Sequence, residues 1–179
     1  MSKTEIRKKI LRLRKKLNPQ KFIIKHKAIL KILKKNKIKG KILGGYYPYN
    51  HEIDVMQILK EFEKKNFIIS LPKIKENFQM DFFKWSNKEP LIINKFGIPE
   101  PISAKVRYPD ILLVPLVAYD KHFNRIGYGG GFYDRYIKKL KVKKKIITIG
   151  LAYSFQKVKK ISVNEHDIKL DFIVTEKEN

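Results

Sequence analysis

The feature that most limits how this 179-residue chain can fold is a glycine-rich turn between an apolar segment and a helical pattern. The apolar segment covers 111–117, glycines occupy positions 127, 129, 130 and 131, and helical periodicity follows over 133–140. This order predicts a strand, a turn and a helix. Glycine is needed where φ is positive or where a ligand approaches the backbone, so the turn could present N–H groups to phosphate. The alternative is a tight turn that only packs the strand against the helix.

Spacing excludes two common phosphate-binding loops. A Walker A loop ends in Gly-Lys-Ser/Thr, whereas Gly131 is followed by Phe132 and Tyr133. The dinucleotide pattern counted from Gly127 requires glycine at position 132, which is phenylalanine. Asp134 falls in the first turn of the expected helix, where a carboxylate can hold a magnesium ion that contacts phosphate. These residues indicate a nucleotide phosphate site with Mg²⁺.

Helix-like and strand-like segments alternate along the chain. Helices are expected after a capping box at Ser2 until Asn18-Pro19, over about 20–35, after Asp54 as N-cap, and over 133–140. Strands are expected over 41–47, 66–71, 80–85, 146–151 and 171–174, and within the 111–117 run as far as Pro115; two prolines predict an irregular segment over 96–101. This alternation predicts a three-layer α/β/α single domain over 1–179 with a largely parallel, mixed sheet.

Composition restricts the partners and the compartment. The net charge of +24 would suit nucleic acid, but only six of the 41 basic residues are arginine and no nucleic-acid-binding motif occurs. We therefore expect mostly solvated lysine, part of which steers anionic substrates toward the protein, and regard a nucleic-acid partner as unlikely. No apolar run reaches ~18 residues, no signal-peptide pattern is present and there is no cysteine, so we expect a cytoplasmic protein without membrane attachment.

The stretch Gly-Tyr-Gly-Gly-Gly-Phe-Tyr-Asp-Arg at 127–135, after Asn-Arg-Ile, resembles the signature of the 5-formyltetrahydrofolate cyclo-ligase family. Other family-like stretches follow in the expected order: Lys3-x-x-x-Arg7, Glu52-Ile53-Asp54, Leu71-Pro72-Lys73, Gly97-Ile98-x-Glu100-Pro101, and the segments 152–156, 165–168 and 174–176. The similarity covers almost the whole chain. It implies that ATP and 5-formyltetrahydrofolate give 5,10-methenyltetrahydrofolate, ADP and phosphate with Mg²⁺ as cofactor, in a monomer or weak dimer.

The resemblance also implies a set of site residues. ATP would be bound by Lys3, Arg7, Arg125, Gly127, Gly129, Gly130, Gly131 and Tyr133. The folate would be bound by Tyr47, Glu52, Tyr128, Gly129, Gly130, Gly131 and Phe132, with Glu52 as a bidentate acceptor for the pterin. Asp134 and Asp167 would hold Mg²⁺, with Arg125 and Asp134 as the catalytic residues. Many relatives carry lysine in place of Gly130, so any contact of that lysine with the γ-phosphate must come from elsewhere here.

Several alternatives remain open from the residues alone. Spacing places Lys3, Arg7 and Arg14 on one helix face, which by itself favours a solvated basic surface. Asp171 competes with Asp167 as the second metal carboxylate because both lie close together in the sequence. The competing functions are a basic RNA- or DNA-binding protein whose glycine turn grips a backbone phosphate, and a regulator that binds ATP without turnover.

Overall fold

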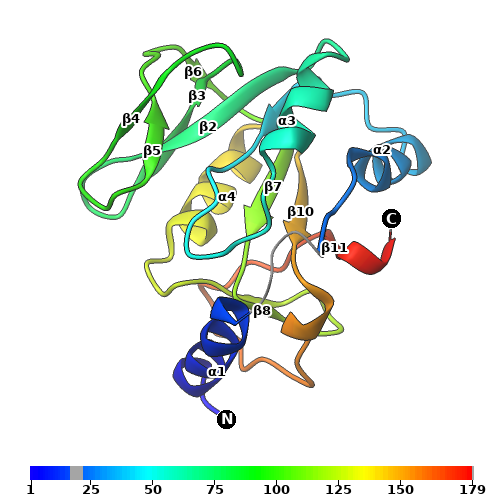
Figure 1. Ribbon diagram of the computed structural model, residues 1–179, viewed down its shortest axis with the longest axis vertical. Helices are drawn as coiled ribbons and strands as arrows, with labels where there is room; N and C mark the ends of the chain where they lie inside the picture. Colours follow the sequence, from blue (N-terminus) through cyan, green and yellow to red (C-terminus); the bar gives the residue numbers. More distant parts are fainter. Residues whose placement is uncertain (17–21, 179) are drawn as a thin grey trace.

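A mixed sheet of seven strands forms the centre of the computed structural model, which describes residues 1–16 and 22–178 (Figure 1). The strand order is β11-β10-β7-β1-β2-β3-β6. The bounds are β1 Ile42–Gly44, β2 Ile68–Ile74, β3 Met80–Lys84, β6 Val106–Arg107, β7 Ile111–Pro115, β10 Ile147–Leu151 and β11 Phe172–Val174. Strands β11, β10, β7, β1 and β2 run parallel, while β3 is antiparallel to both β2 and β6. The predicted largely parallel, mixed sheet is confirmed.

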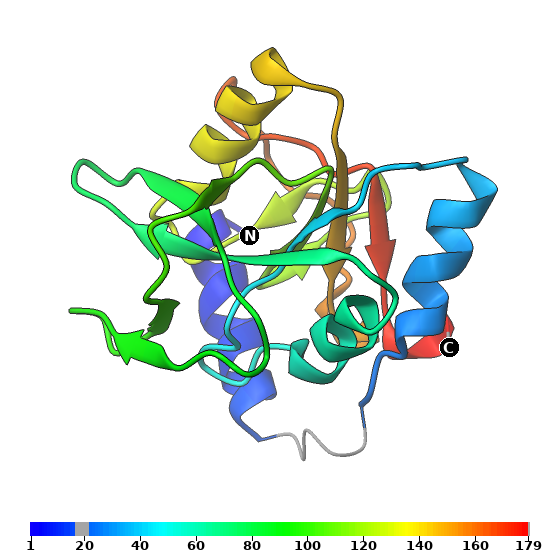
Figure 2. The ribbon, with the colours of Figure 1, turned by 90° about the horizontal axis from the view of Figure 1, so that it is seen from above.

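Alternating side chains of β7 show how the layers form. Ile111 and Leu113 belong to the core cluster that also holds α2 (His26–Lys35) and α3 (Met56–Glu63). Leu112 and Val114 belong to the cluster beneath α4 (Phe132–Lys143). Successive residues of a strand point to opposite faces, so β7 contributes to both cores. Figure 2 shows α4 on one side of the sheet and α2 and α3 on the other, which confirms the three-layer prediction.

Helix α1 (Lys3–Lys15) lies outside these layers, beyond the ends of the strands (Figure 1). Its N-terminus has the predicted capping box of Ser2 and Glu5. Ile6 and Ile10 pack against a small hairpin of β8 (Ala118–Tyr119) and β9 (Arg125–Ile126). The sequence analysis assigned no element to the segment between the 111–117 run and the glycine turn, and this segment forms the hairpin. The hairpin carries the glycine turn toward α1.

The helix starts differ from the predictions. Helix α2 begins at His26, later than predicted; the predicted start at position 20 lies outside the described residues, residues 22–24 have no regular secondary structure, and the N-cap Lys25 is extended. Phe22 packs edge-on against the ring of Tyr153, with centroids 5.6 Å apart. The N-cap of α3 is Val55, although the Asp54 carboxylate accepts a hydrogen bond from the Met56 N–H at 2.8 Å. The predicted helix stop at Asn18-Pro19 lies outside the described residues. Short 3₁₀ helices, η2 (Ser154–Gln156) and η3 (Glu176–Glu178), follow β10 and β11.

Two predictions about proline were too restrictive. Strand β2 continues through Pro72 to Ile74, because beyond Ser70 it pairs only with β3 and needs no N–H on its other edge. The segment predicted to be irregular contains β5 (Pro99–Pro101), which pairs with β4 (Leu91–Ile93) as a two-stranded ribbon. Each strand of a ribbon has a free edge, which tolerates proline. Among the described residues, no helix has the length and apolar character to cross a membrane.

Candidate active site

A cleft of about 890 Å³ opens between the glycine turn, α1, the loop after β1 and the β4–β5 ribbon. It brings together every site residue that the sequence predicted: Lys3, Arg7, Tyr47, Glu52, Arg125, Gly127, Tyr128, Gly129, Gly130, Gly131, Phe132, Tyr133, Asp134 and Asp167. These residues come from segments that are up to 164 positions apart in the chain, as the Lys3–Asp167 contact shows. The cleft is therefore the candidate active site.

The glycine turn meets the cleft with its backbone. Gly129 has φ +107° and Gly131 has φ +66°, conformations that side chains other than glycine rarely adopt. At Gly130, an added Cβ would lie 2.7 Å from the Phe132 ring. Gly131 is also the N-cap of α4, so the positive end of this helix dipole faces the same region. The left-handed glycines are compatible with the predicted anion cradle, and the turn is not sealed under side chains because its residues are exposed or half-buried.

Basic side chains of α1 hold the turn in place. The Arg7 Nε donates a hydrogen bond to the Gly127 carbonyl at 2.9 Å. The Lys3 Nζ pairs with the Asp167 carboxylate at 2.5 Å, and Arg14 is buried. The spacing-based alternative of a solvated basic face is therefore wrong for these three residues. They point inward because Ile6 and Ile10 seat the adjacent face of α1 on the β8–β9 hairpin.

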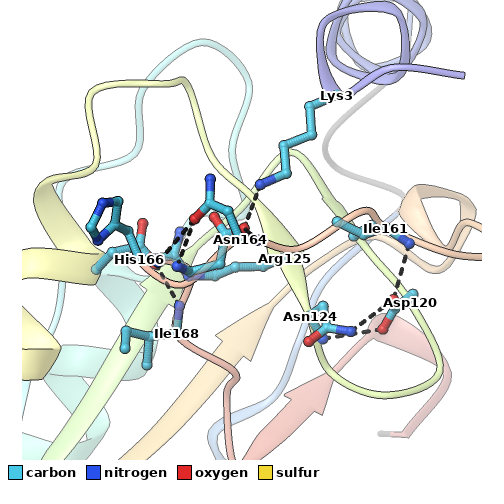
Figure 3. A network of polar contacts seen from close by, with 10 residues as sticks. Lys3, Asp120, Asn124, Arg125, Ile161, Asn164, His166 and Ile168 are labelled. Carbon is cyan, nitrogen blue, oxygen red and sulfur yellow. Dashed lines mark hydrogen bonds and ion pairs between the residues drawn. The ribbon is translucent and has the colours of Figure 1, made fainter.

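Two carboxylates, those of Asp134 and Asp167, interact with the buried guanidinium of Arg125, which lies close to Asn164 in Figure 3. The Arg125 Nη2 is 2.9 Å from the Asp134 Oδ1, and the Arg125 side chain is 5% exposed. Burial lowers the pKa of Arg125, while the charges of Asp134 and Asp167 oppose that shift. Burial is the largest single influence on Asp167 and would raise its pKa, but the hydrogen bonds from Lys3 and from the Asn164 N–H, with the charges of Lys3 and Arg125, together lower the pKa. The Ile168 N–H donates to Asp134 at 3.0 Å, so the two carboxylates belong to one cluster.

The donor set of this cluster fits a magnesium ion. Mg²⁺ prefers oxygen ligands and is usually held by one or two carboxylates, with phosphate oxygens and waters completing the shell. Asp134 and Asp167 supply two carboxylates beside the glycine turn. Across the described part of the chain, no group of three or more His, Cys, Asp or Glu could form a metal cage. Asp171 is not part of the cleft lining, since its carboxylate accepts hydrogen bonds from the Thr148 N–H at 2.8 Å and hydroxyl at 2.7 Å.

Glu52 occupies the other end of the cleft. It is 7% exposed and accepts a hydrogen bond from the Tyr49 N–H at 2.9 Å. Burial raises the pKa of Glu52 to about 7, against the lowering effects of the Tyr49 N–H and the charge of Arg14. Tyr47 lines the cleft beside it, whereas Tyr46 is buried and donates its hydroxyl to the Ile53 carbonyl at 3.1 Å. A buried carboxylate among aromatic rings suits a flat ligand that presents N–H donors.

Sequence reasoning missed part of the lining. One wall of the cleft is formed by Pro72, Ile74, Met80, Phe96, Ile98 and Pro99. The 97–101 stretch was noted as family-like, but its proposed irregularity hid the ribbon that places it opposite the glycine turn. Arg135 was also unassigned, although it lines the cleft and donates to the Gly130 and Phe78 carbonyls. An arginine one turn into the helix after the glycines was the available signal.

Known proteins share this architecture and sequence. The model of the 5-formyltetrahydrofolate cyclo-ligase family matches residues 1–176. A 5-formyltetrahydrofolate cyclo-ligase of Haemophilus influenzae is 32% identical over 139 residues, covering 74% of each chain. One of Mycoplasma genitalium is 34% identical over 135 residues, covering 75% of this chain and 72% of the relative. The solved structure of Aquifex aeolicus 5,10-methenyltetrahydrofolate synthetase superposes with a TM-score of 0.79 at 31% identity, covering 99% of this chain and 91% of that one.

The family model spans nearly the whole chain, including all fourteen predicted site residues, and the similar relatives agree with one another in name. The sheet, the cleft and the matched sequence therefore lead to one assignment. This chain belongs to the 5-formyltetrahydrofolate cyclo-ligase family and is a ligase of that family.

Proposed function

We propose that this protein catalyses the ATP- and Mg²⁺-dependent cyclisation of 5-formyltetrahydrofolate to 5,10-methenyltetrahydrofolate, with release of ADP and phosphate. The observation that carries the proposal is one cleft with an anion cradle at one end and a buried carboxylate among tyrosines at the other. A cleft of this kind suits two substrates that react with each other: a nucleotide triphosphate and a ring system with N–H donors. Family membership supports the same substrates.

The reaction divides into two steps. The formyl oxygen attacks the γ-phosphorus of ATP, the bond between that phosphorus and the ADP oxygen breaks, and an imidate-like phosphate ester forms. N10 of the folate then attacks the formyl carbon, the carbon–oxygen bond to phosphate breaks, and the N10 proton is lost as the ring closes. Neither step needs a covalent protein nucleophile. The protein must align the two substrates and stabilise charge on the phosphoryl group.

At the ATP end, backbone N–H groups of residues 127–131 would bind phosphate oxygens at the start of α4. Lys3, Arg7 and Arg125 line the same end and would add positive charge. The Arg125 side chain is 5% exposed, so burial would keep it in place even when Mg²⁺ takes up Asp134, and it would neutralise charge with little reorganisation. The Tyr133 ring faces the Arg125 guanidinium, whose carbon lies 5.9 Å from the ring centroid, and this contact would limit the movement of Arg125.

Asp134 and Asp167 would hold Mg²⁺, which would supply positive charge that offsets the negative charge on the triphosphate. In the structure these carboxylates pair with Arg125 and Lys3. Binding of the ion would therefore compete with both ion pairs and leave two cations available for phosphate oxygens. Many relatives have lysine at the position of Gly130. Since this chain lacks that lysine, the released Lys3 and Arg125 are our candidates for the contact with the γ-phosphate.

At the folate end, the ionised Glu52 would accept two neighbouring N–H donors of the pterin. Tyr47 and Tyr128 would flank the ring, and Phe132 would continue this surface next to the glycines. The apolar wall that includes Ile74 and Phe96 would contact the remaining aromatic part of the substrate. Burial of Glu52 favours this role, because a hydrogen bond shielded from water discriminates strongly against ligands that lack the donor.

The direct test is to mix the protein with 5-formyltetrahydrofolate, ATP and Mg²⁺ and follow the methenyl absorbance band. Product should form only when all three are present. Asp134→Asn and Asp167→Asn should lose at least 90% of the rate while remaining folded at the assay temperature, in line with the 10²–10³-fold cost typical of losing electrostatic stabilisation. Asp171→Asn is the matched control outside the cleft and should stay active at temperatures where it is folded. Absence of product at every salt concentration would reject the proposal.

We do not propose a nucleic-acid partner or a regulator that only binds ATP. A nucleic-acid surface would not require a buried glutamate at the far end of the cleft, and neither would a nucleotide sensor. Binding to mixed RNA with a steep salt dependence and no ATP-dependent product would favour the first of these alternatives.

A further inference from the structure

Arg14 is a buried charged side chain with no role in the reaction as proposed above. It is 1% exposed, although it is a full cation. Within the described part of the chain, no carboxylate forms an ion pair with it, and its Nε has no hydrogen-bond partner. Burying an unpaired charge costs several kcal/mol, whereas an apolar side chain of similar size would cost little. Arg14 is therefore a poor choice for packing alone.

The two terminal nitrogens of Arg14 connect separate parts of the cleft. Nη1 donates to the Leu116 carbonyl at 3.3 Å, just beyond the end of β7. Nη2 donates to the hydroxyl of Tyr128, in the middle of the glycine turn. The guanidinium carbon also lies 5.5 Å from the centroid of the Tyr128 ring. Arg14 thus ties the turn to the sheet from the side of α1.

The Tyr128 hydroxyl links Arg14 to Tyr49 through two hydrogen bonds. It accepts from Arg14 and donates to the Tyr49 carbonyl at 3.4 Å, which uses both its donor and its acceptor capacity. The rings of Tyr49 and Tyr128 meet edge to face with centroids 5.8 Å apart. The Tyr49 N–H in turn donates to Glu52 at 2.9 Å. One chain of hydrogen bonds therefore runs from Arg14 through Tyr128 and Tyr49 to Glu52.

We propose that Arg14 is a positioning residue that sets the distance between the two ends of the cleft by holding Tyr128 against Tyr49. The proposal rests on the function proposed above, because it assigns the glycine turn to the triphosphate and Glu52 to the folate. A buried, charge-assisted hydrogen bond fixes the hydroxyl more firmly than a neutral donor would. The formyl oxygen and the γ-phosphorus must approach closely and in line, and a displacement of about 1 Å can cost 10²-fold in rate.

A purely structural role makes different predictions. If Arg14 only fastened α1 to the Leu116 carbonyl, its replacement would lower the unfolding midpoint but leave kcat unchanged at temperatures where the protein is folded. Removing the Tyr128 hydroxyl would then have no effect on kcat either. If Arg14 acts through Tyr128, the two changes should share one effect, because the second removes nothing that the first has left.

The test compares wild type, Arg14→Met, Tyr128→Phe and the double variant at a temperature where all are folded. We expect each single variant to lower kcat at least tenfold, with KM for ATP changed less than threefold, and the double variant to be no slower than the slower single one. Arg14→Lys keeps the charge but cannot span both acceptors, so it should recover only part of the rate. Independent, multiplying effects, or a Tyr128→Phe variant with wild-type kcat, would overturn the proposal; Tyr128→Phe decides the matter alone if Arg14→Met does not fold.

Amide chemical shifts separate this proposal from the proposed function. In NMR spectra, the amides of residues 127–131 should shift in Arg14→Met and in Tyr128→Phe, and should shift no further in the double variant, while the amides of β7 stay unchanged. This outcome supports positioning by Arg14 even if the wild type forms no methenyl product, a result that would reject only the proposed reaction. Unchanged shifts of the turn in both single variants would reject the positioning role even in an active enzyme.

Discussion

The raised pKa of Glu52 predicts that affinity for the folate falls as the pH is lowered through neutrality. Its pKa lies at about 7 because the carboxyl is buried, and only the ionised form can accept two N–H donors. With that value, about 90% of Glu52 is ionised at pH 8 and about 10% at pH 6. Affinity for 5-formyltetrahydrofolate should therefore be about tenfold weaker at pH 6 than at pH 8.

Calorimetric titration of 5-formyltetrahydrofolate without ATP measures this directly. The ionic strength must be constant, because a protein of net charge +24 attracts an anionic ligand more strongly at low salt. Glu52→Gln is the matched control, since it keeps the size of the side chain but does not titrate. It should bind more weakly than the wild type at pH 8 and with no dependence on pH. Equal wild-type affinities at pH 6 and pH 8, or a slope that persists in Glu52→Gln, would refute this reasoning.

The same group predicts the opposite pH dependence for stability. The pKa of Glu52 in the folded protein, about 7, lies above the ordinary value of 4.5, so folding favours the protonated form. Its contribution to stability is fully present below pH about 4.5 and is lost as the pH rises through about 7, a difference of about 3 kcal/mol. Chemical denaturation of wild type and Glu52→Gln should show that the free-energy advantage of Gln grows from pH 5 to pH 8.

Three further predictions concern the metal site, the glycine turn and the hairpin. Chelation of Mg²⁺ should abolish product formation. In Asp167→Asn, titration with MgCl₂ should show that the Mg²⁺ concentration for half-maximal rate rises at least tenfold. An unchanged Mg²⁺ requirement would exclude Asp167 as a ligand. Gly129→Ala should lower the free energy of unfolding, measured in urea, by about 1–3 kcal/mol, because a φ of +107° is strained for alanine. Steric overlap is not the cause, since the added Cβ would lie 3.7 Å from its nearest neighbour, an atom of Arg7. An unchanged free energy of unfolding would mean that the turn relaxes easily. Asp120→Ala should lower the free energy of unfolding by about 3 kcal/mol or more, because this buried carboxylate accepts hydrogen bonds from the N–H groups of His122, Asn124 and Ile161. Thermal unfolding measures this loss, with Asp120→Asn as the control. Equal stability of Asp120→Ala and wild type would contradict the prediction.

Local patterns were enough to predict the sheet and the glycine turn, whereas most members of the cleft were predicted through the family resemblance. The apolar run at 111–117 predicted a central strand because buried strands must be apolar on both faces, and β7 is central and buried on both. The glycine turn predicted left-handed backbone conformations, which Gly129 and Gly131 adopt. Asp167 could be paired with Asp134 only through the resemblance, because nothing in the spacing of two residues 33 positions apart fixes their distance.

Tertiary context decided the features that sequence patterns did not predict. The helical pattern at 20–35 included Phe22, but this residue lies outside helix α2 and packs against the Tyr153 ring. The prolines at 99 and 101 excluded a central strand, yet a two-stranded ribbon has only edges. Arg14 was grouped with Lys3 and Arg7 as a surface residue, because periodicity cannot tell which side of a helix will be covered by a later hairpin.

The ion pair between Lys3 and Asp167 limits what can fold while the protein is being synthesised. Ribosomes make a chain from its N-terminus, so Lys3 emerges 164 positions ahead of Asp167 and has no partner until that residue follows. A nascent chain therefore cannot assemble the complete substrate-binding surface until the segment that carries Asp167 has left the exit tunnel. Substrates can stabilise the finished molecule, but they cannot guide the early stages of its folding.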